Sequence, residues 1–170
     1  MKDTKDCIPM ELSSSGKLRL RFACSNDIDL IYPYLRENDI EECRLHKIDP
    51  REVFQSAIYD KEAITYTITV ERIPIAMLGV CDSRFEKNCG VVWMLGTHGI
   101  DKYRISFLKG CHGVIKLLQG DYKKIYNYVP KHHSDTINWL KWCGFELEDK
   151  KYAIENSLFY KFFRCNHLKI

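Results

Sequence analysis

The sequence lacks the cysteine spacings and the long apolar runs that mark several classes of protein. Eight cysteines are scattered over 170 residues and no two are spaced C-x-x-C. The close ligand pairs of a structural zinc site are therefore missing, and we expect no bound metal. No stretch approaches the ~20 apolar residues that span a bilayer. The first segment, MKDTKDCIPMELSSSG, has no apolar run of the kind a secretion signal needs. We therefore expect a protein that is not secreted by a signal peptide and whose cysteines are reduced thiols.

An excess of one charge is also missing. Lys and Arg number 26 against 23 Asp and Glu, which leaves a net charge of +3. That is too little to argue for nucleic-acid binding, although basic and aromatic residues alternate over 102–128. The hydrophobic share of 45% and the charged share of 29% exclude a disordered chain, a collagen or a coiled coil as the overall class. The length suits one domain with its own core.

Periodicity predicts a flexible arm over 1–16 and one mixed α/β domain over 17–170. Period-two patterns and short apolar runs predict strands; these cover 18–22, 64–70, 74–80, 91–95, 124–129, 145–148 and 158–164. Helical spacing and capping residues predict helices; these cover 25–35, 37–46, 50–58, 102–119 and 134–142. Residues 149–157 are expected to be a polar loop. This order is typical of a mostly antiparallel central sheet flanked by helices.

The last predicted strand carries aromatic residues on both of its faces. In the run FYKFF, Phe159 and Phe163 alternate with Tyr160 and Phe162. Such a strand is either buried on both sides or an exposed edge that serves self-association.

The second half of the sequence resembles the GNAT N-acetyltransferases. The strand Val91–Leu95, the helix after Tyr103, the strand Ile125–Val129 and the segment Thr136–Phe145, which ends WLKWCGF, follow one another as in that family. The resemblance implies a buried strand that leads through a pyrophosphate-binding loop into a long helix. It also implies that the next strand splays away and forms the slot for acetyl-CoA.

A closer resemblance is to a phage family of short GNAT-like proteins, described as internal virion proteins or as acetyltransferases of short-tailed phages. The matching motifs are Asp49–Glu52, Trp93–Thr97, Tyr126–Val129 and Trp139–Phe145. The resemblance implies a phage virion or a host protein as partner, and the virion interior or the host cytoplasm as the location.

The coenzyme loop that the GNAT resemblance implies begins at Arg104 and includes Ile105 and Ser106. Backbone N–H groups at a helix start form an anion site, and the family's loop, Arg/Gln-x-x-Gly-x-Gly/Ala, uses glycine so that the backbone can approach the phosphates. Arg104 matches the first position. Phe107 and Lys109 stand where the glycines should be, which puts coenzyme binding in doubt.

Proton-transfer groups are the second requirement of the chemistry. Many GNAT enzymes use a tyrosine as general acid, and its position falls on Leu140, which has no proton to give. An asparagine of the family falls on His133, which together with His132 could transfer protons near neutral pH. On the helix that lines the acceptor site in this family, Glu41 or Glu42 could act as general base.

Two functions fit these residues. The first is a phage protein on a GNAT-like fold, acting in virion assembly or genome delivery with a degraded acetyl-CoA site. The second is an active acetyl-CoA-dependent N-acetyltransferase acting on an amine of a host protein or small molecule. There, the backbone N–H of Leu95 or Gly96 would polarise the thioester carbonyl. Acetyl-CoA is the only cofactor that these functions imply.

Overall fold

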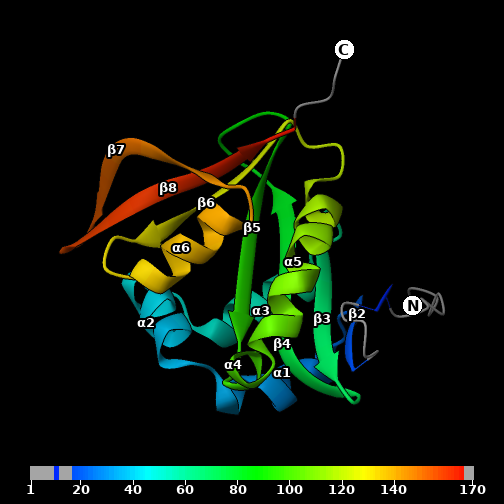
Figure 1. Cartoon of the computed structure of the whole chain (residues 1–170). Helices are drawn as coiled ribbons and strands as arrows, with labels where there is room; N and C mark the ends of the chain where they lie inside the picture. Colours follow the sequence, from blue (N-terminus) through cyan, green and yellow to red (C-terminus); the bar gives the residue numbers. More distant parts are fainter. Residues whose placement is uncertain (1–9, 12–16, 167–170) are drawn as a thin grey trace.

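An eight-stranded sheet organises the computed structural model, which describes residues 10–11 and 17–166 (Figure 1). The strands are β1 (Met10–Glu11), β2 (Leu18–Phe22), β3 (Ile64–Val70), β4 (Ile73–Asp82), β5 (Cys89–Gly96), β6 (Lys124–Pro130), β7 (Glu146–Ile154) and β8 (Ser157–Cys165). Their order in the sheet is β1-β2-β3-β4-β5-β6-β8-β7, and every neighbouring pair is antiparallel except β5 and β6. The predicted mixed α/β class with a mostly antiparallel sheet is confirmed.

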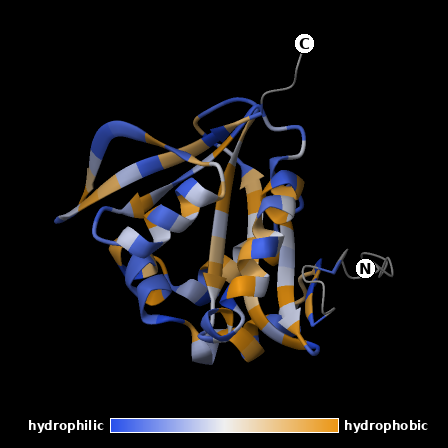
Figure 2. Cartoon of the chain, in the orientation of Figure 1, coloured by the Kyte–Doolittle hydropathy of each residue, from blue (hydrophilic) through white to orange (hydrophobic). Residues whose placement is uncertain are grey.

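Helices cover both faces of this sheet. They are α1 (Ser25–Ile31), the 3-10 turn η1 (Tyr32–Tyr34), α2 (Glu37–Leu45), α3 (Pro50–Tyr59), α4 (Gly99–Lys102), α5 (Arg104–Gln119) and α6 (Ser134–Trp142). One apolar core joins α5 and α6 to the sheet, and a second joins α1, α2 and α3 to it. Successive residues of a strand face opposite sides, so Met77 and Leu95 enter the second core while their neighbour Leu78 enters the first. In Figure 2 the hydrophobic colour accordingly gathers on the central strands and on α5.

Local sequence explains most of the boundaries. Asp49 caps α3 by accepting the N–H of Arg51 at 2.7 Å, as Asp before Pro predicts. Glu71 and Arg72 join β3 to β4 with φ of 48° and 73°, which suits a two-residue hairpin turn. The predicted helix over 25–35 instead divides at Tyr32, because Pro33 follows directly and the chain tightens into η1.

The structure corrects the loop predicted over 149–157 and decides between the two alternatives for the aromatic strand that follows it. The polar loop predicted over 149–157 is wrong, because most of it belongs to β7, the edge strand, whose residues Asp149, Lys150 and Lys151 are exposed. Charged residues suit a sheet edge because they oppose pairing with another chain. β8 lies between β6 and β7, so of the two alternatives for the aromatic strand the burial is confirmed. Phe159 and Phe162 are both buried.

The N-terminal arm is described only in part. Within the predicted range 1–16, Met10 and Glu11 form β1 and pair with Leu20 and Arg19 of β2, and the rest lies outside the described residues. No helix in the described part of the chain is long and apolar enough to cross a membrane.

Candidate functional site

The parallel strands β5 and β6 separate soon after they meet. Their pairing covers Cys89 to Val91 on β5 and Lys124 to Tyr126 on β6, and then it ends. At the point of separation Asn127 Nδ2 donates to the carbonyl of Val92 at 2.7 Å. The two strands thus splay apart, as the resemblance to the GNAT family implied, and we call this separation the split.

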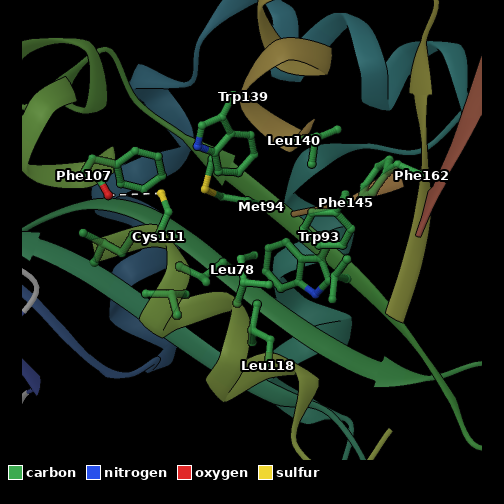
Figure 3. Close-up of a pocket in the computed structure, with 14 residues that line it drawn as sticks. Leu78, Trp93, Met94, Phe107, Cys111, Leu118, Trp139, Leu140, Phe145 and Phe162 are labelled. Carbon is green, nitrogen blue, oxygen red and sulfur yellow. Dashed lines mark hydrogen bonds between the residues drawn. The ribbon is translucent and has the colours of Figure 1, made fainter. Parts of the chain in front are cut away.

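A cavity of about 70 Å³ lies beside the split, between the sheet and helices α5 and α6 (Figure 3). The side chains around it are apolar or aromatic apart from the thiol of Cys111. That thiol donates to the carbonyl of Phe107 at 3.1 Å. The Nε1 of Trp139 is buried without an acceptor among the described residues. The cavity therefore suits an apolar group and offers little to a charged one.

Two positions at which the sequence departs from the GNAT pattern line this cavity. Phe107, at a position where the GNAT resemblance implies a loop glycine, is buried and stacks on Trp139 with ring centroids 5.8 Å apart. Leu140, at the position that the resemblance gives to the general-acid tyrosine, is also buried against the cavity. The Phe107–Trp139 stack joins α5 to α6 beside the cavity.

The predicted coenzyme loop is an exposed helix start. The first hydrogen bond of α5 runs from the N–H of Phe107 to the carbonyl of Tyr103 at 2.9 Å. The N–H groups of Arg104, Ile105 and Ser106 thus precede the hydrogen-bond ladder and form the positive end of the helix. Arg104 and Ile105 are exposed, so an anion could approach them from solvent.

The other predicted backbone donors are oriented differently from expectation. The N–H of Gly96 already donates to Asp39 Oδ2 at 2.8 Å, and its carbonyl accepts the N–H of Arg36 at 3.0 Å. Val92 and Gly96 thus direct their polar groups toward the split. Backbone N–H and C=O groups alternate between the two edges of a strand, so those of Met94 also point toward the split, whereas those of Leu95 point toward β4. The sequence did not identify Met94 as a backbone donor, because the alternation of a strand does not show which of its two edges will lack a hydrogen-bonded neighbouring strand.

Asp39 ties α2 to the end of β5. Its carboxylate accepts two guanidinium nitrogens of Arg36 at 3.0–3.1 Å in addition to the N–H of Gly96. Burial raises the pKa of Asp39, although the Arg36 charge and the Gly96 hydrogen bond oppose this, and the nearby His133 opposes it too.

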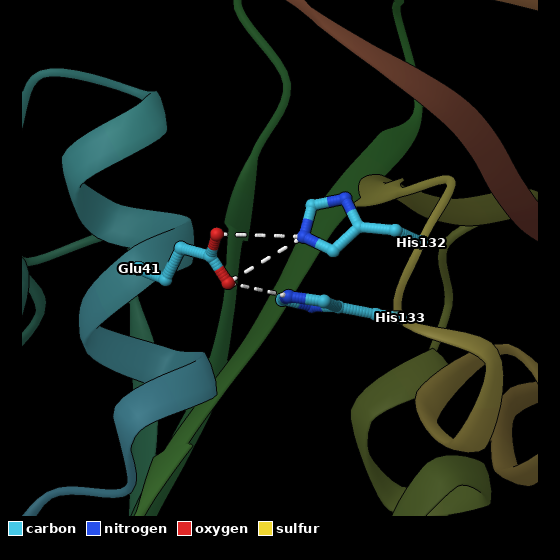
Figure 4. A group of neighbouring side chains, drawn as sticks. All are labelled: Glu41, His132 and His133. Carbon is cyan, nitrogen blue, oxygen red and sulfur yellow. Dashed lines mark hydrogen bonds and ion pairs between the residues drawn. The ribbon is translucent and has the colours of Figure 1, made fainter.

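The structure brings the predicted catalytic residues Glu41 and His133 together (Figure 4). His133 Nε2 lies 3.1 Å from Glu41 Oε2, and His132 Nε2 lies 3.4 Å from Glu41 Oε1. The side chain of His133 is only 4% exposed, against 54% for His132. The hydrogen bonds from His133 and His132 lower the pKa of Glu41. Glu41 is therefore a weaker proton acceptor than an ordinary glutamate.

Its neighbour Glu42 behaves in the opposite way. Burial and the negative charge of Asp39 raise the pKa of Glu42 to about 8, the range in which a carboxyl group can both accept and donate a proton near neutral pH. The sequence allowed either Glu41 or Glu42 as the general base, and the raised pKa of Glu42 favours Glu42.

Solved structures resemble this chain throughout its length. A GCN5-related N-acetyltransferase from Kribbella flavida superposes with a TM-score of 0.67 at 13% identity, covering 90% of this chain and 100% of its own. The chain has the GNAT fold. A ribosomal-protein-S5-alanine acetyltransferase from Vibrio fischeri gives 0.66 at 16% identity, covering 94% and 97% of the two chains. RimL in complex with coenzyme A gives 0.65 at 10% identity, covering 93% and 98%. No family model matches the sequence, and no curated protein matches it.

Proposed function

We propose that this chain uses the GNAT fold as a scaffold for virion assembly or genome delivery in a phage, and that its slot no longer transfers acetyl groups. The observation that carries the proposal is the Phe107–Trp139 stack, with centroids 5.8 Å apart, at the slot between α5 and α6. This aromatic pair, of which Phe107 is buried and Trp139 partly buried, takes the space of a ligand, and Leu140 beside it supplies no proton.

The residues that carry the phage resemblance support the same conclusion. Trp93–Thr97 lies at the end of β5, Tyr126–Val129 on β6, and Trp139–Phe145 at the end of α6. Trp93, Met94, Trp139, Leu140 and Phe145 all line the cavity. Two of the four motifs shared with the phage family thus contribute side chains to the lining of the cavity.

The first experiment is a calorimetric titration of the full chain with acetyl-CoA. We expect no binding heat at about 1 mM ligand, a concentration that would detect even weak complexes. RimL, whose solved structure holds coenzyme A, is the positive control. Micromolar binding by this chain would contradict the loss of the site. Mass spectrometry of gradient-purified particles from the source phage should detect the chain, and its absence would contradict the virion role.

A second candidate, an active N-acetyltransferase, is favoured by the exposed start of α5. The N–H groups of Arg104, Ile105 and Ser106 could bind a pyrophosphate, Met94 offers backbone groups in the split, and Glu42 could accept the proton of an amine. The test is acetyl transfer to a panel of amines by the wild-type chain and by Arg104→Ala. This candidate requires turnover that Arg104→Ala lowers at least tenfold. The variant Arg84→Ala, at an exposed arginine on another loop, should leave turnover unchanged.

A further inference from the structure

We propose that Glu41, His132 and His133 form a binding site for a divalent transition-metal ion such as Zn²⁺, bridging α2 to the turn between β6 and α6. One ligand atom from each of the three side chains lies within 4.8 Å of the others. Two imidazoles and one carboxylate are a common ligand set for Zn²⁺, which then keeps one position open for water or substrate. The site uses no cysteine, so the cysteine spacing that argued against a metal does not bear on it.

The spacing of the ligand atoms fits such an ion. Zn–N bonds of 2.0–2.1 Å and Zn–O bonds of 2.0–2.2 Å, arranged tetrahedrally, place neighbouring ligand atoms about 3.3–3.5 Å apart. The Nε2 of His133 lies 3.1 Å and the Nε2 of His132 lies 3.5 Å from the same oxygen, Glu41 Oε2. The two imidazole nitrogens lie within 4.8 Å of each other, so the rings would turn toward each other when they bind the ion.

Backbone hydrogen bonds hold His133, the buried metal-ligating residue, in position before any ion binds. His133 precedes the first turn of α6, where its carbonyl accepts the N–H of Ile137 at 3.0 Å and its own N–H donates to Pro130 at 3.0 Å. The ring of His132 packs edge-on against that of His133, with centroids 4.5 Å apart. Preorganised ligands bind an ion at a lower entropic cost than mobile ones.

The exposed part of the site leaves a path for the ion. The side chains of Glu41 and His132 are 36% and 54% exposed, whereas that of His133 is almost fully buried. In Figure 4 the carboxylate reaches from α2 toward the two rings on the opposite segment. An ion there would link two elements that are more than 90 positions apart in sequence.

The alternative is a hydrogen-bonded group without a metal, in which each imidazole donates Nε2–H to Glu41. The two arrangements differ in a measurable way, because a metal displaces those protons and requires both Nε2 atoms as ligands. Metal binding by the chelator-treated chain therefore decides between them.

The experiment is a titration of the chelator-treated full chain with Co²⁺, followed by its visible absorption, and then displacement by Zn²⁺. We expect one ion per chain and the intense absorption of low-coordinate Co²⁺ with nitrogen and oxygen ligands. His132→Ala and Glu41→Gln should each weaken binding at least about tenfold. Both residues are partly exposed, and a far-UV circular dichroism spectrum checks that each variant is folded.

Two histidine variants control for other sites. His112→Ala removes an exposed histidine on α5. His98→Ala removes one that lies 3.3 Å from Glu37 and 3.4 Å from Asp101. Both should bind as the wild type does. The proposal would be overturned if the chain bound no stoichiometric ion at about 100 µM. It would also be overturned if His98→Ala abolished binding while His132→Ala retained it.

Discussion

Adjacent carboxyl groups on α2 have pKa values shifted in opposite directions. Hydrogen bonds from His133 and His132 lower the pKa of Glu41, while burial and Asp39 raise that of Glu42 to about 8. Neighbouring residues on a helix point about 100° apart. Glu41 therefore meets the imidazoles of His132 and His133, whereas Glu42 experiences burial and the charge of Asp39.

The raised pKa of Glu42 makes its contribution to stability depend on pH. The folded protein holds this proton more tightly than the unfolded chain, so stability falls as pH rises from the ordinary glutamate value of about 4.3 through about 8. We expect Glu42→Gln, which cannot ionise, to be about 2–4 kcal/mol more stable than the wild type at pH 8 and nearly equal to it at pH 4. Urea unfolding at both pH values measures this. Glu52→Gln, at an exposed site on α3, should show no such dependence, and a gain for Glu42→Gln that is equal at both pH values would refute the assignment.

Asp27 is a buried carboxylate with the opposite behaviour. Burial alone would raise its pKa, but hydrogen bonds from Arg21, from the Cys24 N–H and from Thr67 outweigh this and hold the pKa below its ordinary value. Its contribution to stability is therefore complete above about pH 4 and is lost as pH falls through the lowered value.

We expect Asp27→Asn to lower the free energy of unfolding by about 2–4 kcal/mol at pH 7, because Arg21 loses its carboxylate partner. Guanidinium unfolding monitored by tryptophan fluorescence measures the loss, which should shrink toward pH 2. Asp29→Asn is the control: Asp29 sits on the same helix in an exposed ion pair with Arg51, and its loss should cost less than about 1 kcal/mol. Equal losses in the two variants would contradict the role of burial.

At the scale of elements, the Phe107–Trp139 stack couples α5 to α6 across the split. We expect Phe107→Ala to lower the free energy of unfolding by about 3–5 kcal/mol, because a buried ring is replaced by a void next to an existing cavity. Urea denaturation measures this. Ile105→Ala, two residues earlier on α5 at 72% exposure, should change stability by about 0.5 kcal/mol or less. A Phe107→Ala variant as stable as Ile105→Ala would mean that the helices are not joined through this ring.

Elements were predictable where local pattern decides them. Asp49 with Pro50 marks the start of α3, and the alternation from Ile64 onward marks the β3–β4 hairpin. The strand β7 was not predictable in this way, because an edge strand needs no apolar face and its charged residues resemble those of a loop. The meeting of Glu41 with His133 was not predictable either, since it depends on packing between distant segments.

At the scale of the whole molecule, the order of elements and a resemblance spread along the chain made the fold predictable. What the slot holds was harder to foresee. The sequence indicates that Phe107 and Leu140 depart from the GNAT pattern, but the stack with Trp139 depends on how α5 and α6 pack. A sequence pattern thus identifies the residues that depart from the family, and the packing of the helices determines which contacts those residues make.

The two cores share one sheet, so we expect them to open together. Cys43 lies in the core beneath α2, and Cys111 lies in the core beneath α5. Burial raises the pKa of the Cys43 thiol to about 12, and only the thiolate reacts readily. Labelling with an alkylating reagent, read by peptide mass spectrometry, should modify the exposed Cys24 first among the cysteines that the structure describes. Cys43 and Cys111, two of the four buried cysteines that the structure describes, should follow much more slowly, at rates suppressed by the same free energy of opening. If Cys43 were labelled well before Cys111, the helices on its side would open as a separate unit, and the sheet would not unite the two cores.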